Sequence, residues 1–353
     1  MMKATQYFLF LFAATGVVKA EYSESGYRFV GRVNPDTNEL TWPSTGVAFT
    51  FTGTVASINV NSVSGTSSVD LFIDNNEPIV IPNVNSTSIS TPTLSPGTHS
   101  IELRKRSETN FGTFRITDVT TDGILVPGTT PTRKIEIIGD SISVGYGLDG
   151  VNPCTNTAFL EDNPKTYGAL AANAVGADYS VVAWSGKGLY RNYMSTTPDT
   201  SPTMPVLYTR YGANDADNSF TFPQSWIPDA AVINLGTNDF SYLGVRDPAN
   251  PADLTAALVD LMAKINRHYP AAKIFLVSSP LLSDSYPTSA DAQKSTQLKV
   301  YQDAADQLPN VTTRIVDWPS QGSDVGCDYH PNAATHAAGA ALLEDALRAE
   351  MGW

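Results

Sequence analysis

Short stretches of alternating hydrophobic and polar residues dominate the chain up to about Val126, and clusters of Gly, Pro, Asn and Ser separate them. Alternation with a period of two is expected of strands that bury one face. The pattern predicts strands at Val47–Thr54, Val55–Val60, Val69–Ile73 and Ile101–Arg106. Many short strands divided by turn residues are typical of an antiparallel β-sandwich, and we predict such a domain over residues 21–127.

The pattern changes after Arg133, where strand-length apolar runs alternate with segments whose apolar residues recur every three or four positions. The apolar runs predict strands at Ile135–Ile138, Tyr179–Ala183, Ala231–Leu235, Ile274–Val277 and Thr313–Val316. The longer segments predict helices at Lys165–Val175, Ala252–Tyr269, Ala290–Leu308 and Ala333–Met351. Strands that alternate with helices form a parallel sheet with helices on both faces. Residues 134–353 are therefore predicted to be an α/β domain.

Residues 128–133 separate the two patterns and are predicted to be a linker. Pro127 and Pro131 restrict the backbone at this point, and a short, proline-restricted connection does not behave as a flexible tether. We therefore expect the two domains to pack against each other.

The first twenty residues have the composition of a secretory signal peptide. Lys3 precedes an apolar run from Tyr7 to Val18, and Val18-Lys19-Ala20 carries the small residues of a cleavage site. An apolar run of 12 residues is too short to cross about 30 Å of hydrocarbon, which argues against a membrane anchor. The sequence thus predicts a signal peptide over residues 1–20 and a secreted, extracellular protein.

Secretion changes what two other residue types imply. Cys154 and Cys327 are the only cysteines, and an even pair in an oxidising compartment is expected to form a disulfide. Asn85 and Asn310 begin Asn-X-Ser/Thr triplets, which makes them candidate glycosylation sites in a eukaryotic host.

The balance of charge excludes several classes of partner. The 22 Lys and Arg residues stand against 35 Asp and Glu, so the formal charge is −13. A field of this sign repels nucleic-acid phosphates and anionic lipid headgroups. We therefore expect no nucleic-acid partner and no membrane partner, and nothing in the sequence indicates an obligate protein partner.

A candidate nucleophile ends the first strand of the α/β domain, in Gly139-Asp140-Ser141. A serine hydroxyl needs an adjacent base, usually histidine, to take its proton. His330 lies in a polar loop between the last strand and the last helix, whereas His99, His268 and His336 are expected to be structural. In an extended segment residues i and i+2 share a face, so the carboxylate of Asp328 is expected to orient the imidazole of His330.

Acyl transfer also needs hydrogen-bond donors for the oxyanion that develops on the substrate. Two loops that follow predicted strands offer such donors: Trp184–Gly188, through a glycine N–H, and Asn234–Asp239, through an amide. Asp140 and Asp239 are expected to brace these loops by hydrogen bonds. No cluster of metal ligands is evident, since Cys154 and Cys327 lie far apart in sequence, and we expect neither a metal nor a cofactor.

These motifs resemble those of the SGNH (GDSL) hydrolases in order and in position at strand ends. The resemblance extends to the carbohydrate esterases of family 2 through Arg104–Glu108, Ile135–Ser141, Trp184–Asn192 and Cys327–Pro331. It covers nearly all of the mature chain. It implies a flavodoxin-like three-layer α/β/α domain with a parallel sheet, preceded by an all-β jelly-roll-like sandwich, and an activity that removes acetyl groups from hemicellulose.

Carried over position by position, the resemblance makes Ser141 the nucleophile and His330 the base. The oxyanion hole would consist of the N–H groups of Ser141 and Gly186 and the side chain of Asn238. One departure leaves two mechanisms open: most SGNH enzymes place the acid three residues before the histidine, where this chain has Cys327. Asp328 is therefore either the third member of a triad or a neighbour of a Ser-His dyad whose imidazole is oriented by backbone carbonyls.

The sequence thus predicts a secreted serine esterase that deacetylates acetylxylan or acetylated glucomannan through an acetyl-enzyme intermediate, with an acetylated polysaccharide or oligosaccharide as its partner. Aromatic side chains stack on sugar rings, and the candidates are Trp318, Tyr190, Trp184 and Tyr146. Two alternatives remain: an SGNH esterase or lipase that acts on another ester, and a non-catalytic carbohydrate-binding protein.

Overall fold

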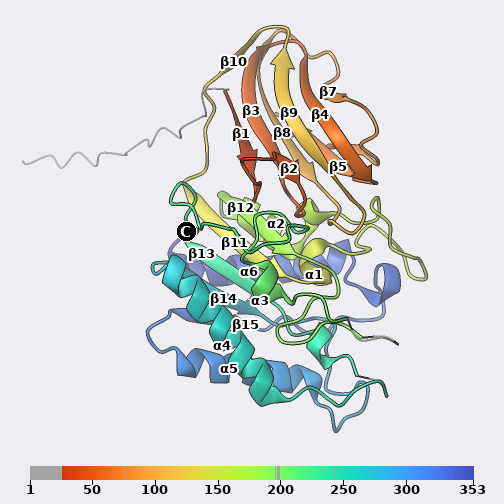
Figure 1. Ribbon diagram of the computed structural model, residues 1–353, viewed down its shortest axis with the longest axis vertical. Coiled ribbons are helices and arrows are strands. Elements are labelled where there is room, and N and C mark those ends of the chain that lie inside the picture. Colours follow the sequence, from red (N-terminus) through yellow and green to blue (C-terminus); the bar gives the residue numbers. More distant parts are fainter. Residues whose placement is uncertain (1–25, 75, 195, 197–198, 243) are drawn as a thin grey trace, which may run out of the picture.

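The computed structural model describes residues 26–353 except 75, 195, 197–198 and 243. The predicted signal peptide, residues 1–20, lies outside the described residues. The described chain folds into an antiparallel sandwich that packs on one end of an α/β domain (Figure 1). Among the described helices, none is long and apolar enough to cross a membrane.

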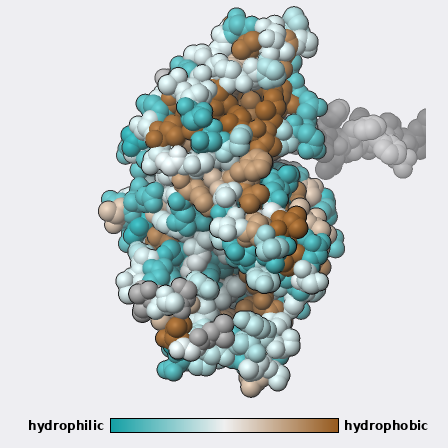
Figure 2. All heavy atoms as spheres, turned by 90° about the vertical axis from the view of Figure 1, so that its right-hand side faces the viewer, coloured by the Kyte–Doolittle hydropathy of each residue, from teal (hydrophilic) through white to brown (hydrophobic). Residues whose placement is uncertain are grey.

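Two antiparallel sheets form the N-terminal sandwich. Alternate side chains of facing strands point inward, such as Phe49 and Phe51 from one sheet and Ile58 and Val60 from the other, and they form one buried cluster. The first sheet contains β1 (Tyr27–Val30), β3 (Gly46–Gly53), β8 (Gly97–Lys105), β5 (Val69–Ile73), β6 (Ile79–Ile81) and, paired with β3, β10 (Ile124–Val126). The second contains β2 (Glu39–Leu40), β9 (Gly112–Thr121), β4 (Ala56–Gly65) and β7 (Ser88–Ser90). In Figure 2 hydrophobic side chains also gather on one outer face of the sandwich.

A five-stranded parallel sheet forms the centre of the C-terminal domain, in the order β12-β11-β13-β14-β15. Its strands are β11 (Arg133–Gly139), β12 (Ala177–Ala183), β13 (Ala230–Asn234), β14 (Lys273–Val277) and β15 (Thr313–Val316). The four longer helices are α2 (Tyr167–Ala174), α4 (Pro251–His268), α5 (Gln293–Gln307) and α6 (Ala333–Met351). The short ones are α1 (Ser141–Val144), η1 (Asn163–Lys165), α3 (Met204–Leu207), η2 (Asn238–Phe240) and η3 (Cys327–Tyr329).

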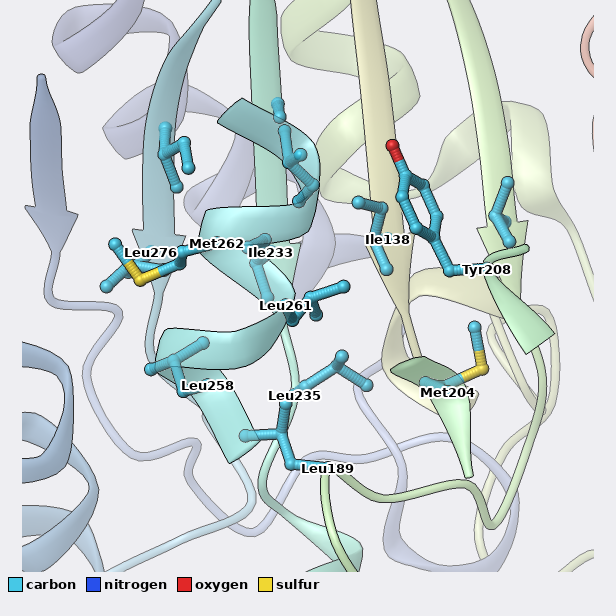
Figure 3. Packing of buried hydrophobic residues seen from close by; sticks show 14 of the residues in the cluster. Ile138, Leu189, Met204, Tyr208, Ile233, Leu235, Leu258, Leu261, Met262 and Leu276 are labelled. Carbon is cyan, nitrogen blue, oxygen red and sulfur yellow. The ribbon is translucent and has the colours of Figure 1, made fainter. Parts of the chain in front are cut away.

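Helices cover both faces of this sheet, as the sequence pattern predicts. Ile135 and Ile137 of β11 point into the cluster under α2 and α6, and Ile138 points into the cluster under α4 and α5 (Figure 3). Asn250 caps α4 by accepting a hydrogen bond from the N–H of Ala252. The order of the strands and the two helical layers confirm the three-layer fold.

The prediction that the domains pack together is also confirmed. Trp42 of the sandwich is buried in the core of the α/β domain and donates a hydrogen bond from Nε1 to the carbonyl of Tyr211 at 2.8 Å. Arg32 and Glu136 form a buried ion pair across the interface at 2.6 Å. The sandwich therefore covers polar groups of the α/β domain as well as apolar ones.

Candidate active site

Ser141 lies just beyond the carboxyl end of β11, at the start of α1. The turn is held by Asp140, whose Oδ1 accepts a hydrogen bond from the N–H of Ile142 at 3.0 Å. A side chain at position 139 would collide with the hydroxyl of Ser143, so the turn requires Gly139. This geometry presents the Ser141 hydroxyl to the cavity at the sheet edge.

His330 lies where a base for this serine would be needed. Its Nε2 lies 2.9 Å from the Oγ of Ser141, although the two residues are 189 positions apart in sequence. The ring of Tyr146 packs against the imidazole, with the ring centroids 4.2 Å apart. The imidazole is therefore placed to take the hydroxyl proton.

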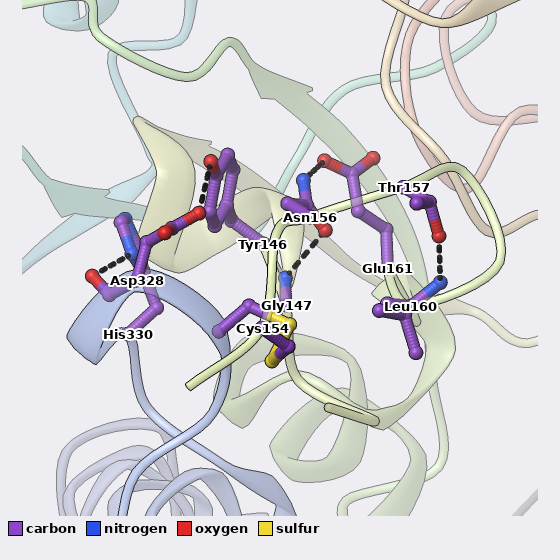
Figure 4. The surroundings of a disulfide bond; sticks show 10 residues. Tyr146, Gly147, Cys154, Asn156, Thr157, Leu160, Glu161, Asp328 and His330 are labelled. Carbon is purple, nitrogen blue, oxygen red and sulfur yellow. Dashed lines mark hydrogen bonds between the residues drawn. A yellow bond between two sulfur atoms is a disulfide. The ribbon is translucent and has the colours of Figure 1, made fainter. Parts of the chain in front are cut away.

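The carboxylate of Asp328 faces Tyr146 instead of the imidazole (Figure 4). The hydroxyl of Tyr146 donates to Oδ2 of Asp328 at 2.9 Å, while Nδ1 of His330 lies 3.2 Å from the backbone carbonyl of Asp328. We expected an extended backbone at this point, but η3 forms a turn in which Asp328 and Tyr329 have φ of 50° and 64°. Residues two apart do not share a face in such a turn, so the predicted contact between the carboxylate and the imidazole is wrong.

The other three histidines have structural partners, as expected. His99 contacts the carboxylate of Asp74 through Nδ1 at 2.7 Å. His268 stacks on Phe222, with the ring centroids 3.7 Å apart. His336 is a buried residue of α6 and accepts a hydrogen bond from the N–H of Tyr167.

Ser141, Gly186 and Asn238, the predicted oxyanion donors, line the same cavity. Gly186 has φ of 82°, a left-handed conformation that glycine adopts without strain. The Nδ2 of Asn238 donates to the carbonyl of Lys187 at 2.9 Å and to Oδ2 of Asp140 at 3.2 Å. These bonds fix the amide beside the serine and engage both of its N–H groups, so donation to an oxyanion would replace one of them.

Asp140 and Asp239 brace the surrounding loops, as predicted. The carboxylate of Asp239 accepts hydrogen bonds from the N–H groups of Leu189, Tyr190 and Arg191 at 2.8 to 3.0 Å. Burial raises the pKa of Asp239 to about 6 and that of Asp140 to about 7. The loop that carries Gly186 is thus tied to the segment that carries Asn238.

The prediction that Trp318 forms a surface platform for sugar is wrong. Trp318 is only 2% exposed and packs against Tyr167 and His336 in the core. Trp184 and Tyr190 pack at the edge of the other core cluster and are not among the described residues that line the cavity. Of the four proposed aromatics, Tyr146 lies at the cavity.

Sequence reasoning missed other aromatic residues at the cavity, which has a volume of about 590 Å³. Tyr193 and Tyr286 line it and are 53% and 61% exposed. Tyr286 lies in a polar loop after β14, so its position beyond the carboxyl end of a strand was the signal that could have identified it.

The predicted disulfide between Cys154 and Cys327 is present. It joins the loop after α1 to η3, three residues before His330 (Figure 4). The carbonyl of Gly147 also accepts a hydrogen bond from the N–H of Cys327. The segment that carries His330 is therefore fastened to the segment that follows Ser141. Within the described residues, no group of three or more His, Cys, Asp or Glu side chains is arranged to hold a metal ion.

Comparison with known proteins identifies the family of both domains. The carbohydrate esterase 2 N-terminal domain matches residues 29–127, and the GDSL-like lipase/acylhydrolase family matches residues 137–338. A carbohydrate esterase family 2 enzyme plus carbohydrate binding domain from Corynascus thermopiles (Myceliophthora fergusii) is 62% identical, with a TM-score of 0.90, over 93% of this chain and 100% of that chain. The chain belongs to carbohydrate esterase family 2.

Other relatives of this family 2 esterase include an acetylxylan esterase/glucomannan deacetylase from Cellvibrio japonicus, 30% identical over 80% of this chain and 78% of that protein. A family two carbohydrate esterase from Clostridium thermocellum, solved in complex with cellohexaose, is 28% identical with a TM-score of 0.82, over 93% of this chain and 99% of that chain. The cellulase/esterase CelE of Acetivibrio thermocellus is 30% identical, and the match spans 91% of this chain but 38% of that protein. The assignment as a carboxylic ester hydrolase follows.

In this esterase, Asp328→Asn should reduce kcat by no more than about tenfold. The acceptor for Nδ1 of His330 is a backbone carbonyl, which the substitution leaves in place, and an asparagine oxygen still accepts from Tyr146. A carboxylate that set the tautomer of the base would be worth about 10⁴-fold. Steady-state hydrolysis of p-nitrophenyl acetate distinguishes the two, and a loss of that larger size would restore the triad.

The esterase should also remain active well below the ordinary pKa of histidine. Burial disfavours the charged imidazolium and lowers the pKa of His330 to about 4, although the carbonyl and charge of Asp328 act in the opposite direction. The neutral, basic imidazole thus persists to more acidic pH. The acidic limb of kcat/KM should have its midpoint nearer to about 4 than to the usual 6.5. A midpoint of the acidic limb at pH 6.5 or above would contradict a buried environment that lowers the pKa of His330.

Proposed function

We propose that this esterase is secreted and removes O-acetyl groups from plant cell-wall hemicellulose, either acetylated xylan or acetylated glucomannan, through an acetyl-enzyme intermediate. The observation that carries the proposal is the 2.9 Å contact between Ser141 and His330 in an open cavity bordered by exposed tyrosines. The relatives described as acetylxylan esterases and glucomannan deacetylases support the substrate class.

The chemistry begins when Oγ of Ser141 attacks the acetyl carbonyl carbon and Nε2 of His330 takes its proton. The carbonyl π bond opens, and the negative charge on its oxygen is stabilised by the N–H groups of Ser141 and Gly186 and the amide of Asn238. The intermediate then expels the sugar hydroxyl, whose oxygen receives the proton from the imidazolium. Water, activated by the same imidazole, releases acetate and regenerates the serine.

The backbone carbonyl of Asp328 would hold Nδ1–H of His330 during these steps. In this arrangement the acceptor is the main chain, so the proposed site is a dyad supported by a carbonyl. The bond from Tyr146 to the Asp328 carboxylate would keep η3 in its left-handed conformation.

Two further features fit an extracellular enzyme. The pair Cys154–Cys327 is oxidised, and disulfides persist in oxidising compartments. Asn85 and Asn310, the proposed glycosylation sites, are both exposed.

Acetate release from acetylated xylan, acetylated glucomannan and acetylated pectin, compared with fatty-acid release from long-chain esters, tests the substrate class. We expect the two hemicelluloses to be the best substrates. Preference for pectin or for long-chain esters would replace the proposed substrate. Binding of these polysaccharides without any hydrolysis of p-nitrophenyl acetate would make the protein a carbohydrate-binding protein.

Tyr286→Ala should raise KM for acetylated hemicellulose by about threefold to tenfold, the value of one aromatic stacking contact. KM and kcat for p-nitrophenyl acetate should stay unchanged, since its acyl group reaches Ser141 without a sugar chain on the rim. Phe159→Ala is the matched control, because Phe159 is 49% exposed and is not among the residues that line the cavity. Equal effects of both variants on the polysaccharide would rule out a rim site at Tyr286.

A further inference from the structure

The motif Arg104–Glu108 belongs to the sandwich, yet its side chains are buried against the α/β domain. Arg104 donates to the carbonyl of Tyr179 on β12, the edge strand of the parallel sheet, at 3.3 Å. Arg106 pairs with Asp162 of the α/β domain at 3.0 Å. These contacts cover an open strand edge and hold the two domains together.

Glu108 differs from these residues because it reaches the loop of the oxyanion hole. Its Oε2 accepts a hydrogen bond from the N–H of Ser185 at 2.9 Å, and Ser185 directly precedes Gly186. A second contact from the sandwich reaches the preceding residue, where Nε1 of Trp184 donates to Oδ1 of Asn110 at 2.8 Å. The loop is therefore fixed on its β12 side by the sandwich.

The opposite end of this loop is fixed from within the α/β domain, where Asp239 accepts the N–H groups of Leu189, Tyr190 and Arg191. Gly186 lies between the two carboxylate anchors. A glycine in this left-handed conformation has no side chain to hold its peptide plane. The direction of its N–H therefore depends on the neighbouring peptide units. The N–H of one neighbour, Ser185, donates to the carboxylate of Glu108.

The surroundings of Glu108 suit a rigid anchor. The residue is 1% exposed, and its own N–H donates to Oε2 of Glu161 at 2.6 Å. Burial raises the pKa of Glu108, while the ammonium group of Lys105 acts in the opposite direction. Nζ of Lys105 donates to the carbonyl of Glu108 at 3.0 Å, which fixes the backbone of the anchor itself.

We propose that Glu108 is a positioning residue for the esterase reaction: through the N–H of Ser185, the sandwich domain sets the direction of the Gly186 N–H toward the oxyanion. The proposal rests on the proposed role of Gly186 in the oxyanion hole. It makes the N-terminal domain a part of the catalytic machinery in addition to a cover for the sheet edge.

Two variants of Glu108 distinguish the effect of side-chain length from the effect of side-chain charge. Glu108→Asp keeps the charge beside Lys105 but shortens the side chain by one methylene, so it cannot reach Ser185 from the same backbone position. Glu108→Gln keeps the length and an accepting oxygen but removes the charge. If positioning matters, kcat for p-nitrophenyl acetate falls about tenfold or more in Glu108→Asp and at most about threefold in Glu108→Gln, with KM nearly unchanged in both. A purely structural role predicts the opposite order, with the larger loss of kcat in Glu108→Gln, because the charge next to Lys105 would then determine the loss.

The affinity for methylboronic acid is a readout that a change in protein stability does not affect. Its adduct with Ser141 places an oxygen in the oxyanion hole. Its affinity should fall in Glu108→Asp by the same factor as kcat. Glu39→Asp is the control: Glu39 pairs with Arg115 inside the sandwich at 3.3 Å, and this variant should retain kcat and boronate affinity. Wild-type kcat and boronate affinity in folded Glu108→Asp would overturn the inference and leave the esterase assignment intact. Failure of the wild-type protein to hydrolyse the ester would instead remove the proposed function.

Discussion

Ser141→Ala should reduce kcat by a factor on the order of 10⁶, because removal of a serine nucleophile from a comparable catalytic unit costs about that much. No bond to the acetyl group forms without Oγ of Ser141, and the imidazole of His330 is left with no hydroxyl to activate. Both p-nitrophenyl acetate and acetylated xylan should show the loss. Release of acetate from either substrate at the wild-type rate would end the serine mechanism.

Ser143→Ala is the matched control for this experiment. Ser143 lies on the same short helix, is buried, and bonds to the hydroxyl of Tyr167 at 3.0 Å, but it is not among the residues that line the cavity. Its loss should cost about 1 kcal/mol of stability and leave kcat nearly unchanged. Similar kcat losses in both variants would indicate that α1 as a whole had moved.

Asn238→Ala should reduce kcat by about 10²- to 10³-fold, the effect of removing one donor to an oxyanion. KM should change little, because the donated bond strengthens only as charge develops on the carbonyl oxygen. The same variant should lose affinity for methylboronic acid by a similar factor. A change confined to KM would make Asn238 a residue that positions the substrate in its ground state.

The positions of the strands and of Ser141 and His330 could be predicted because they depend on local pattern. The strands Val69–Ile73 and Thr313–Val316 and the helix Ala333–Met351 agree with the structure residue for residue. Ser141 and His330 each follow a strand, and parallel strands bring their carboxyl ends to one edge. Their contact therefore follows from the topology of the sheet.

The errors concern features that depend on backbone conformation or on distant partners. The side chain of Asp328 is turned away from His330 by a left-handed φ that its residue type does not reveal. Trp318 is buried because Gly339 of α6 leaves room for its ring. Its burial therefore depends on a residue twenty-one positions further along the chain. Glu108 acts across the domain interface, which no local pattern in the sandwich indicates.

The order of the strands has a consequence for the enzyme during its own synthesis. Ser141 follows the first strand of the sheet and His330 follows the last, so a growing chain carries its nucleophile long before it carries its base. Cys327 leaves the ribosome only three residues ahead of His330, so the disulfide that ties this segment to the loop after α1 cannot close before this late stage. Every fragment that stops short of His330 lacks the proposed base, so we expect the growing chain to have no esterase activity until the loop before its final helix has been made.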